Sequence, residues 1–366
     1  MGATQRIPEL FTHNIWYIIM PSAAAAPDNK SDLVWHNVED WGVEGKGWSD
    51  TERYYDRFPG RARGSVRDPV WDLSRHSAGM CVRFETDAES IHVRYKLLNE
   101  RLAMAHMPAS GVSGLDLYAE NSDGVDRWVS VVAPESQTID QAIAQNLADG
   151  SRRYTIYLPL YNGVETLEIG VSRDALFSSE SPRTEPPMVF YGTSITHGAC
   201  ASRPGMAFPA IIGRRLRRPT INLGFSGNGQ METEIVELLT ELEASVYVID
   251  CLPNMTPDLV KERSEPLVRQ IRGAHPDTPI LLVEDRTFTN APFIRSQMEV
   301  HTERRSGLRT AYEELQAEGL TGLYYLAGDD ILGSDGEGAT DGSHPNDLGM
   351  MRYADGYEPV LCEIAV

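Results

Sequence analysis

The sequence predicts two folded regions, an all-β sandwich followed by an α/β domain with a parallel sheet. From about Val34 to Val171, apolar and polar residues alternate in short runs, which is typical of half-buried strands in antiparallel sheets. After Met188, continuous apolar runs alternate with helical stretches, which is typical of a parallel sheet covered on both faces. A polar, proline-rich linker at 179–187 separates the two patterns.

In the predicted sandwich, residues 31–178, turn sequences such as Asn121–Gly124 separate the runs, as in a sandwich or jelly roll. The clearest runs are Gly79–Phe84, Ser90–Tyr95, Leu115–Tyr118 and Arg153–Leu158. In the predicted α/β domain, residues 188–366, the strands are expected at Met188–Tyr191, Thr220–Leu223, Val246–Cys251, Ile280–Val283 and Leu323–Leu326. The helical stretches include Met231–Leu242, Pro257–Arg272 and Phe293–Glu318. Ligands of open α/β sheets bind beyond the carboxyl ends of the strands, so functional residues are expected in the loops that follow these runs.

The composition restricts the classes of partner. Of the 366 residues, 41% are hydrophobic, and 33 Lys and Arg against 53 Asp and Glu give a net charge of −20. This charge repels phosphate backbones and anionic lipid heads, so we expect neither a nucleic-acid partner nor a membrane role. The four cysteines are scattered, which predicts no disulfide framework, and Cys251 is interpreted as a buried strand residue. The oligomeric state stays unknown.

Residues 1–30 are predicted to be a leader or a disordered segment. Ile15–Met20, followed by Pro21–Ala26, faintly resembles a signal peptide, but its basic flank is poor because Glu9 offsets Arg6. No stretch reaches the ~20 apolar residues that span a bilayer. The compartment therefore stays open, with the cytoplasm slightly favoured over secretion.

A serine follows the first apolar run of the α/β domain, within Gly192–Gly198 (GTSITHG). At the end of a strand and the start of a helix, Ser194 is a candidate nucleophile. The motif alone is weak, because a serine that opens a helix also serves as an N-cap. It also differs from the GxSxG elbow, since Thr196 replaces the second glycine.

The loop after the last apolar run carries Asp341 three residues before His344. A serine hydroxyl becomes a nucleophile when an imidazole accepts its proton, and a carboxylate holds that imidazole in the required tautomer. Asp341 and His344 are candidates for these two roles. The alternative is a solvated acidic loop that contains an incidental histidine.

Two further loops offer hydrogen-bond donors. Glycines within Asn222–Gly229 let the backbone turn tightly, and Asn254 brings a side-chain amide to the end of the third apolar run. The N–H groups of Ser194 and Gly227 and the amide of Asn254 would together form an oxyanion hole. Taken singly, Gly227 also fits a turn and Asn254 a helix cap.

The four loops together resemble the SGNH hydrolases, the GDSL-like lipase and acylhydrolase superfamily, over about residues 188–362. The blocks that name the family correspond here to Ser194, Gly227, Asn254 and His344. The N-terminal region resembles the β-sandwich of one bacterial branch, because Gly114–Tyr118 (GLDLY) is similar to its GxDLY signature. The resemblance implies a flavodoxin-like three-layer domain that hydrolyses acyl esters with no metal and no cofactor.

The sequence departs from the family pattern in two places. Thr193 stands where many members have Asp, and Pro253 and Met255 flank Asn254 where Gly and Asp are common. Neither departure removes a catalytic group, although Pro253 restricts the backbone beside Asn254.

Three rival interpretations of the same residues are possible. The glycines of 224–229, with Asp250 as a ribose acceptor, could indicate dinucleotide binding, but their spacing reverses the GxGxxG order. The acidic stretch 328–341 could hold calcium, but it lacks the alternating spacing of an EF-hand loop. A non-catalytic carbohydrate-binding protein is the third, because all six tryptophans lie between Trp16 and Trp128 and aromatic faces stack on sugars.

The distribution of tryptophans also leads to a substrate hypothesis. We expect an acetyl or other short acyl ester, on a small molecule or a carbohydrate, with the sandwich forming one wall of the cleft. His106 and Arg286 are candidate substrate-binding residues of this wall. No extended apolar lid is evident, which disfavours long-chain lipids, while arylesters, lactones and thioesters stay open.

Overall fold

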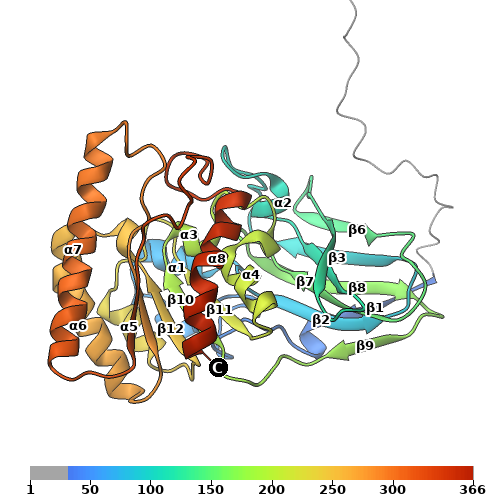
Figure 1. The fold of residues 1–366 in the computed structure, drawn as a ribbon. Coiled ribbons are helices and arrows are strands. Elements are labelled where there is room, and N and C mark those ends of the chain that lie inside the picture. The colour runs from blue at the N-terminus through green and yellow to red at the C-terminus, as the bar shows by residue number, and fades with distance from the viewer. Residues whose placement is uncertain (1–31, 366) are drawn as a thin grey trace, which may run out of the picture.

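The computed structural model describes residues 32–365. Figure 1 shows a β-sandwich beside a layered α/β region. The leader predicted at 1–30 lies outside the described residues.

The N-terminal region forms two antiparallel sheets. The first contains, in spatial order, β1 (Leu33–Asn37), β8 (Val164–Ser172), β3 (Ile91–Leu97) and β6 (Thr138–Ala144). The second contains β5 (Asp126–Val131), β4 (Asp116–Glu120), β7 (Arg152–Tyr157), β2 (Cys81–Thr86) and β9 (Phe177–Glu180). Alternate residues of the two sheets, such as Val93 and Ile156, meet in one buried core, which explains the period of two in the sequence. The predicted sandwich is confirmed.

The last strand of the sandwich, β9, extends into the linker predicted at 179–187. It pairs antiparallel with β2 at the edge of the sheet. Phe177 is the only apolar residue among the four of β9. An edge strand can be short and polar, so no hydrophobic pattern in the sequence indicates this one.

The C-terminal region contains a five-stranded parallel sheet whose strands match the predicted apolar runs to within one residue. The order is β11 (Thr220–Gly224), β10 (Met188–Gly192), β12 (Val246–Asp250), β13 (Ile280–Val283) and β14 (Leu323–Leu326). The first strand lies between the second and the third, which is the flavodoxin-like order. Val189 and Tyr191 face one apolar core and Met188 and Phe190 the other, so both faces of the sheet are buried.

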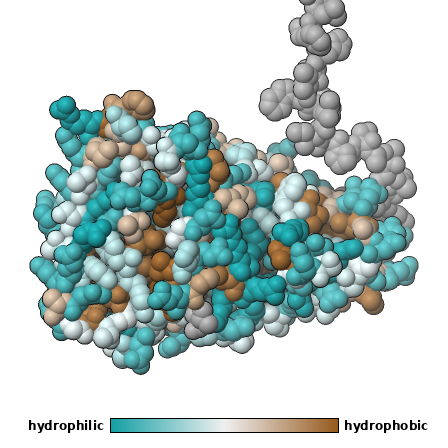
Figure 2. Space-filling view, in the orientation of Figure 1, coloured by the Kyte–Doolittle hydropathy of each residue, from teal (hydrophilic) through white to brown (hydrophobic). Residues whose placement is uncertain are grey.

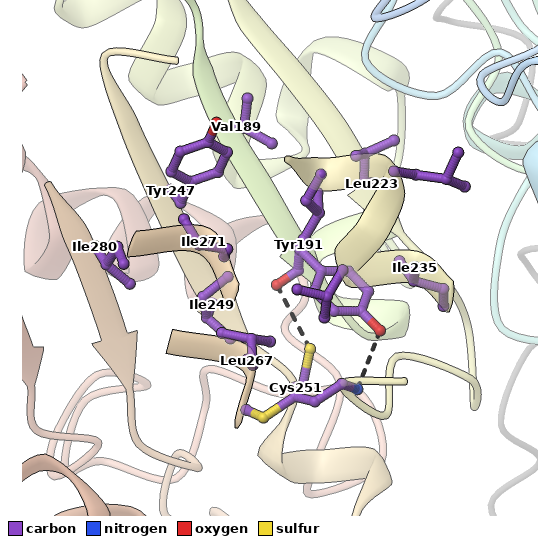
Figure 3. Packing of buried hydrophobic residues seen from close by; sticks show 14 of the residues in the cluster. Val189, Tyr191, Leu223, Ile235, Tyr247, Ile249, Cys251, Leu267, Ile271 and Ile280 are labelled. Atoms are coloured by element: carbon purple, nitrogen blue, oxygen red, sulfur yellow. Dashed lines mark hydrogen bonds between the residues drawn. The ribbon is translucent and has the colours of Figure 1, made fainter. Parts of the chain in front are cut away.

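Helices cover both faces of this sheet (Figure 1). One face is covered by α3 (Ser194–His197), α4 (Phe208–Arg215) and α8 (Asp347–Ile364), and the other by α5 (Thr233–Leu239), α6 (Pro257–Ala274) and α7 (Arg295–Ala317). Figure 3 shows the core between the sheet and α5, α6 and α7, where the thiol of Cys251 contacts the carbonyl oxygen of Tyr191 at 3.7 Å. Burial raises the pKa of this thiol well above its usual value, so Cys251 is the inert buried residue that the sequence predicted.

One segment of the N-terminal region, 45–76, leaves the sandwich and packs into the α/β core. It contains α1 (Asp68–Ser74), which Figure 1 shows among the elements of the α/β region although it precedes β2 in the chain. Its side chains in that core are Trp48, Phe58, Ala62, Val66, Val70 and Trp71. A short helix, α2 (Ala109–Val112), also approaches the α/β region, with Gly111 against the backbone of Ala201. The two regions are therefore consecutive in sequence but interlocked in space.

Within residues 32–365, no helix is both long and apolar enough to cross a membrane. In the same residues, no group of three or more His, Cys, Asp or Glu side chains is placed to hold a metal ion.

Candidate active site

A tight turn places Ser194 at the carboxyl end of β10. Gly192 is required in this turn, because a Cβ there would lie 2.1 Å from Thr196 Oγ1 and 2.7 Å from the carbonyl oxygen of Asp250. Thr193 caps α3, since its hydroxyl accepts a hydrogen bond from the N–H of Ile195. The hydroxyl of Ser194 is therefore not used as a helix cap.

The serine, the histidine and the aspartate form a continuous chain of hydrogen bonds. Ser194 Oγ lies 2.8 Å from His344 Nε2, and His344 Nδ1 lies 2.7 Å from Asp341 Oδ2. The other carboxylate oxygen of Asp341 accepts the N–H groups of Ser343 at 3.0 Å and His344 at 2.8 Å. These bonds fix the loop that presents the imidazole to the serine, although the two residues are 150 positions apart.

The hydrogen bonds to Asp341 keep its carboxyl group ionised. Partial burial acts to raise its pKa, but the bonds from His344 and Ser343 outweigh burial and lower the pKa to about 2. A charged carboxylate holds the proton on His344 Nδ1 and leaves Nε2 as the acceptor for the serine proton. Ser194 is buried, but the side chain of His344 is 29% exposed, so the imidazole remains accessible from solvent.

Three groups are candidate donors to an oxyanion. Within residues 32–365, the backbone N–H groups of Ser194 and Gly227 donate to no other group. Asn254 Oδ1 accepts the N–H of Gly229 at 3.3 Å, which leaves Nδ2 as the unused donor of the amide. Asn254 does not cap α6, because Thr256 takes that role. Gly227 has a φ of +70° and is exposed outside the cavity, so its contribution stays a prediction.

A cavity of about 330 Å³ opens beside Ser194, a size typical of a small-molecule site. It lies at the carboxyl ends of the strands and is bounded on one side by the first half of α7. Its lining includes Ser194, Asn254, Arg286, Gln297, Arg304 and His344. Phe293 and Ile294, which directly precede α7, and Met298 within it are exposed to solvent. Figure 2 shows apolar surface at the exposed upper end of the α/β region.

Comparison with known proteins identifies the family. The profile of the GDSL-like Lipase/Acylhydrolase family matches residues 185–362, and the GxDLY profile, for the N-terminus of SGNH-hydrolase-type esterases, matches residues 33–177. A solved structure from Bacteroides ovatus, described as a GDSL-like lipase, is 32% identical, with a TM-score of 0.86 over 91% of this chain and 98% of that one. The chain belongs to the GDSL-like lipase/acylhydrolase family. It is therefore an SGNH-type ester hydrolase, as the motifs predicted.

More distant structures share the fold of this SGNH hydrolase. A salicylyl-acyltransferase from a tetracycline biosynthetic pathway is 17% identical, with a TM-score of 0.70 over 92% of this chain and 95% of that one. An acetyl xylan esterase from the rumen bacterium Butyrivibrio proteoclasticus is 10% identical, with a TM-score of 0.54 over 90% and 98%. The comparison with curated proteins gave no match. Membership of an ester-hydrolase family argues against the dinucleotide, calcium and non-catalytic interpretations.

The two predicted wall residues of the hydrolase lie near the site in different ways. The ring of His106 is exposed and lies 6.4 Å from the ring of His344, outside the lining of the cavity. Arg286 lines the cavity but is only 2% exposed, and its Nε donates to the carbonyl of Ser343 at 3.1 Å. Its Nη atoms contact Asp285 and the hydroxyl of Ser343. This geometry favours a role for Arg286 in holding the loop of His344.

A buried guanidinium from the N-terminal region lies beneath the loops of the hydrolase site. Arg57 is 2% exposed, and burial lowers its pKa to about 9. It donates to the backbone carbonyls of Leu73, His76, Asn222 and Gly224. Tyr161, from the sandwich, bonds the carbonyl of Ser194 at 3.4 Å and stacks on His197. The N-terminal region thus contacts the backbone of the proposed nucleophile itself and that of β11, the strand beside β10.

Sequence reasoning missed Arg57 and the face of α7 that lines the cavity. Gln297, Val300 and Arg304 are spaced by three and four residues, which places them on one side of the helix. The helix itself was predicted, but this spacing is also that of any amphipathic helix. No signal in the sequence shows which surface the face meets.

Proposed function

We propose that this ester hydrolase cleaves short-chain acyl esters, acetyl esters above all, on carbohydrates, with Ser194 as nucleophile, His344 as general base and Asp341 as its partner. The unbroken chain of hydrogen bonds from Ser194 Oγ through His344 to Asp341, at 2.8 and 2.7 Å, carries this proposal.

In the first half of the reaction, Ser194 Oγ attacks the acyl carbon while its proton passes to His344 Nε2. Asp341 stabilises the imidazolium that forms and does not take the proton itself. The negative charge on the former carbonyl oxygen is stabilised by the N–H of Ser194, by Asn254 Nδ2 and by the N–H of Gly227. The bond between the acyl carbon and the alcohol oxygen then breaks, and His344 protonates that oxygen as the alcohol leaves.

The second half of the reaction releases the acid. Water attacks the acyl group on Ser194, and His344 accepts a proton from that water. The bond from the acyl carbon to Ser194 Oγ breaks, His344 returns the proton to the serine, and the carboxylic acid leaves. Both halves use the same three side chains, and the ester and one water are the reactants.

The dimensions of the site and the related folds support the substrate. A cavity of about 330 Å³ fits a short acyl group with part of an alcohol, and Asn254, Gln297 and Ser343 supply polar lining. Structures of this fold include the acetyl xylan esterase and a family two carbohydrate esterase from Clostridium thermocellum in complex with cellohexaose, 14% identical with a TM-score of 0.53 over 78% of this chain and 92% of that one.

The positions of the tryptophans do not support a sugar-binding role at this cavity. Trp48 and Trp71 are buried in the α/β core, and the cavity lining contains no tryptophan among residues 32–365.

The test is hydrolysis of 4-nitrophenyl acetate, butyrate and octanoate, together with acetate release from acetylated xylo-oligosaccharides. We expect a steep preference for acetate, acetate release from the oligosaccharide, and loss of both activities in Ser194→Ala and His344→Ala. Ser122→Ala, in an exposed loop of the sandwich, is the matched control and should retain full activity. Unimpaired turnover by Ser194→Ala refutes the nucleophile, and the absence of acetate release from the acetylated oligosaccharide by an enzyme that turns over 4-nitrophenyl acetate refutes the substrate.

A further inference from the structure

One part of the cavity lining is positively charged. Two guanidinium groups, those of Arg286 and Arg304, line the cavity, and no carboxylate lines it among residues 32–365. Both arginines bond one shared carboxylate behind the wall, that of the fully buried Asp285, and Arg304 Nη1 lies 3.0 Å from it. Two positive charges therefore bond one carboxylate. Two further carboxyl groups are near: Asp250, whose pKa burial raises to about 7 and which interacts with Arg286, and Asp341, which lies behind His344, to which it is bonded.

The two arginines differ in what they have left to donate. The Nε of Arg286 is used by the carbonyl of Ser343, and its Nη atoms contact Ser343 and Asp285. The Nε of Arg304 is shielded from solvent and has no hydrogen-bond partner, and its Nη2 has no partner among residues 32–365. Nε and Nη2 form one edge of the guanidinium, whose two parallel N–H groups match the two oxygens of a carboxylate.

A second polar atom without a partner lies on the same helical face. Gln297 Oε1 is shielded from solvent and lacks a hydrogen bond, and Gln297 lines the same cavity. A buried polar group without a partner costs free energy, so two such groups on side chains that line one cavity are candidates to be completed by a polar ligand. Val300 lies between them along α7, and Phe288 adds an aromatic surface to the same wall.

We propose that the ester bound at this site carries a carboxylate, which the Nε–Nη2 edge of Arg304 binds while Gln297 bonds a neighbouring polar group. This inference rests on the proposed ester hydrolysis at Ser194. The carboxylate belongs either to the acyl half of the ester or to its alcohol half, as in an acetylated sugar acid. The protein carries a net charge of −20, which repels anions at long range, so selection of an anion depends on this local contact.

The test uses two pairs of esters in which a carboxylate is replaced by a neutral primary amide. The pair for the alcohol half is 4-acetoxyphenylacetate and 4-acetoxyphenylacetamide, and the pair for the acyl half is mono-(4-nitrophenyl) glutarate and the 4-nitrophenyl ester of glutaramic acid, each corrected for spontaneous hydrolysis. In at least one pair, the wild-type enzyme should prefer the anion by about 10- to 100-fold in kcat/KM, as expected for a charge-assisted bidentate contact. The pair that shows the preference identifies the half of the ester that carries the carboxylate.

Variants locate the contact. Arg304→Gln should abolish the preference and Arg304→Lys, which keeps the charge but loses the paired edge, should retain only part of it. Arg127→Gln, the same change in an exposed arginine of the sandwich, should leave the ratio unaltered. If Arg304→Gln does not fold, phenylacetate should inhibit the wild-type enzyme competitively and phenylacetamide should not.

The outcomes separate this inference from the proposed function. Hydrolysis that depends on Ser194 but shows no preference for the anion in either pair, or a preference that survives in Arg304→Gln, overturns the carboxylate site and leaves the esterase intact. Equal inhibition by phenylacetate and phenylacetamide also overturns it. Turnover of 4-nitrophenyl acetate that persists in Ser194→Ala overturns both.

Discussion

The two regions of this hydrolase contribute to the site in different ways. The α/β region supplies every group that we propose to react with substrate, from the loops that follow its parallel strands. The N-terminal region supplies buried supports, because Arg57 and Tyr161 contact the backbone of the loops that carry Ser194 and Gly224. Reactive side chains are thus carried on accessible loops, while the geometry of those loops depends on contacts with residues distant in sequence.

The sharpest test of this division removes a reacting group without touching the fold. In Asp341→Asn, the amide cannot hold the same tautomer of His344, so kcat for 4-nitrophenyl acetate should fall by about 10³- to 10⁴-fold. The midpoint of urea unfolding should change little, because the side chain of Asp341 is half exposed. Asp335→Asn, in the same loop but bonded to Arg352, is the control and should keep its activity.

The opposite change removes a support. Arg57→Met leaves four backbone carbonyls without this donor, two of them in buried hydrogen bonds, so the free energy of unfolding should fall by about 3–5 kcal/mol. The surviving folded enzyme should also lose kcat, because Gly224 begins the loop that carries Gly227. Urea unfolding and steady-state kinetics measure the two effects. A variant with unchanged stability and activity would break the comparison between reacting and supporting regions.

Asp250 sharpens the comparison from another side, because it ends a strand of the α/β region yet does not line the cavity. Burial raises the pKa of its carboxyl group to about 7, against a hydrogen bond from Tyr357 at 2.9 Å and the charge of Arg286. The folded state therefore binds a proton that the unfolded state releases near pH 4, so this group's contribution to stability falls as pH rises from about 4 to 7.

Asp250→Asn should remove that dependence and stabilise the protein above pH 7, by at most about 4 kcal/mol. Urea unfolding of the wild type and the variant at pH 5 and pH 8 measures it. If the two proteins lose the same stability between these pH values, Asp250 is not the titrating group.

The smallest effect is expected at Tyr161. Its hydroxyl bonds the carbonyl of Ser194 at 3.4 Å, a weak contact, and its ring stacks on His197 at 4.1 Å. Tyr161→Phe keeps the stacking, so stability should change by no more than about 1 kcal/mol and kcat by a few-fold. Tyr161→Ala removes both contacts, and an effect no larger than that of Tyr161→Phe would show that the ring gives no support.

The sequence predicted the parallel sheet well, because continuous apolar runs of four to six residues need a sheet that is covered on both faces. Ser194, Asn254 and His344 could be found because each follows such a run, which brings them to one edge of the sheet. Segment 45–76 lies between runs that alternate with a period of two, so it was included in the predicted sandwich. Its own apolar residues follow neither the period of a strand nor that of a helix, so nothing in the sequence marks it as part of the α/β core. The cavity face of α7 and the burial of Arg286 escaped prediction because they depend on which distant surfaces meet.

The path of segment 45–76 has a consequence for biosynthesis. Trp48, Phe58 and Trp71 leave the ribosome before any strand of the parallel sheet against which they pack. About 200 further residues, up to the end of α6, must follow, which takes roughly 10–40 s at ordinary rates of translation. During that interval these side chains lack their native neighbours in the α/β core, so much of their apolar surface stays exposed to contact with other chains. Neither half expressed without the other would form a complete interior.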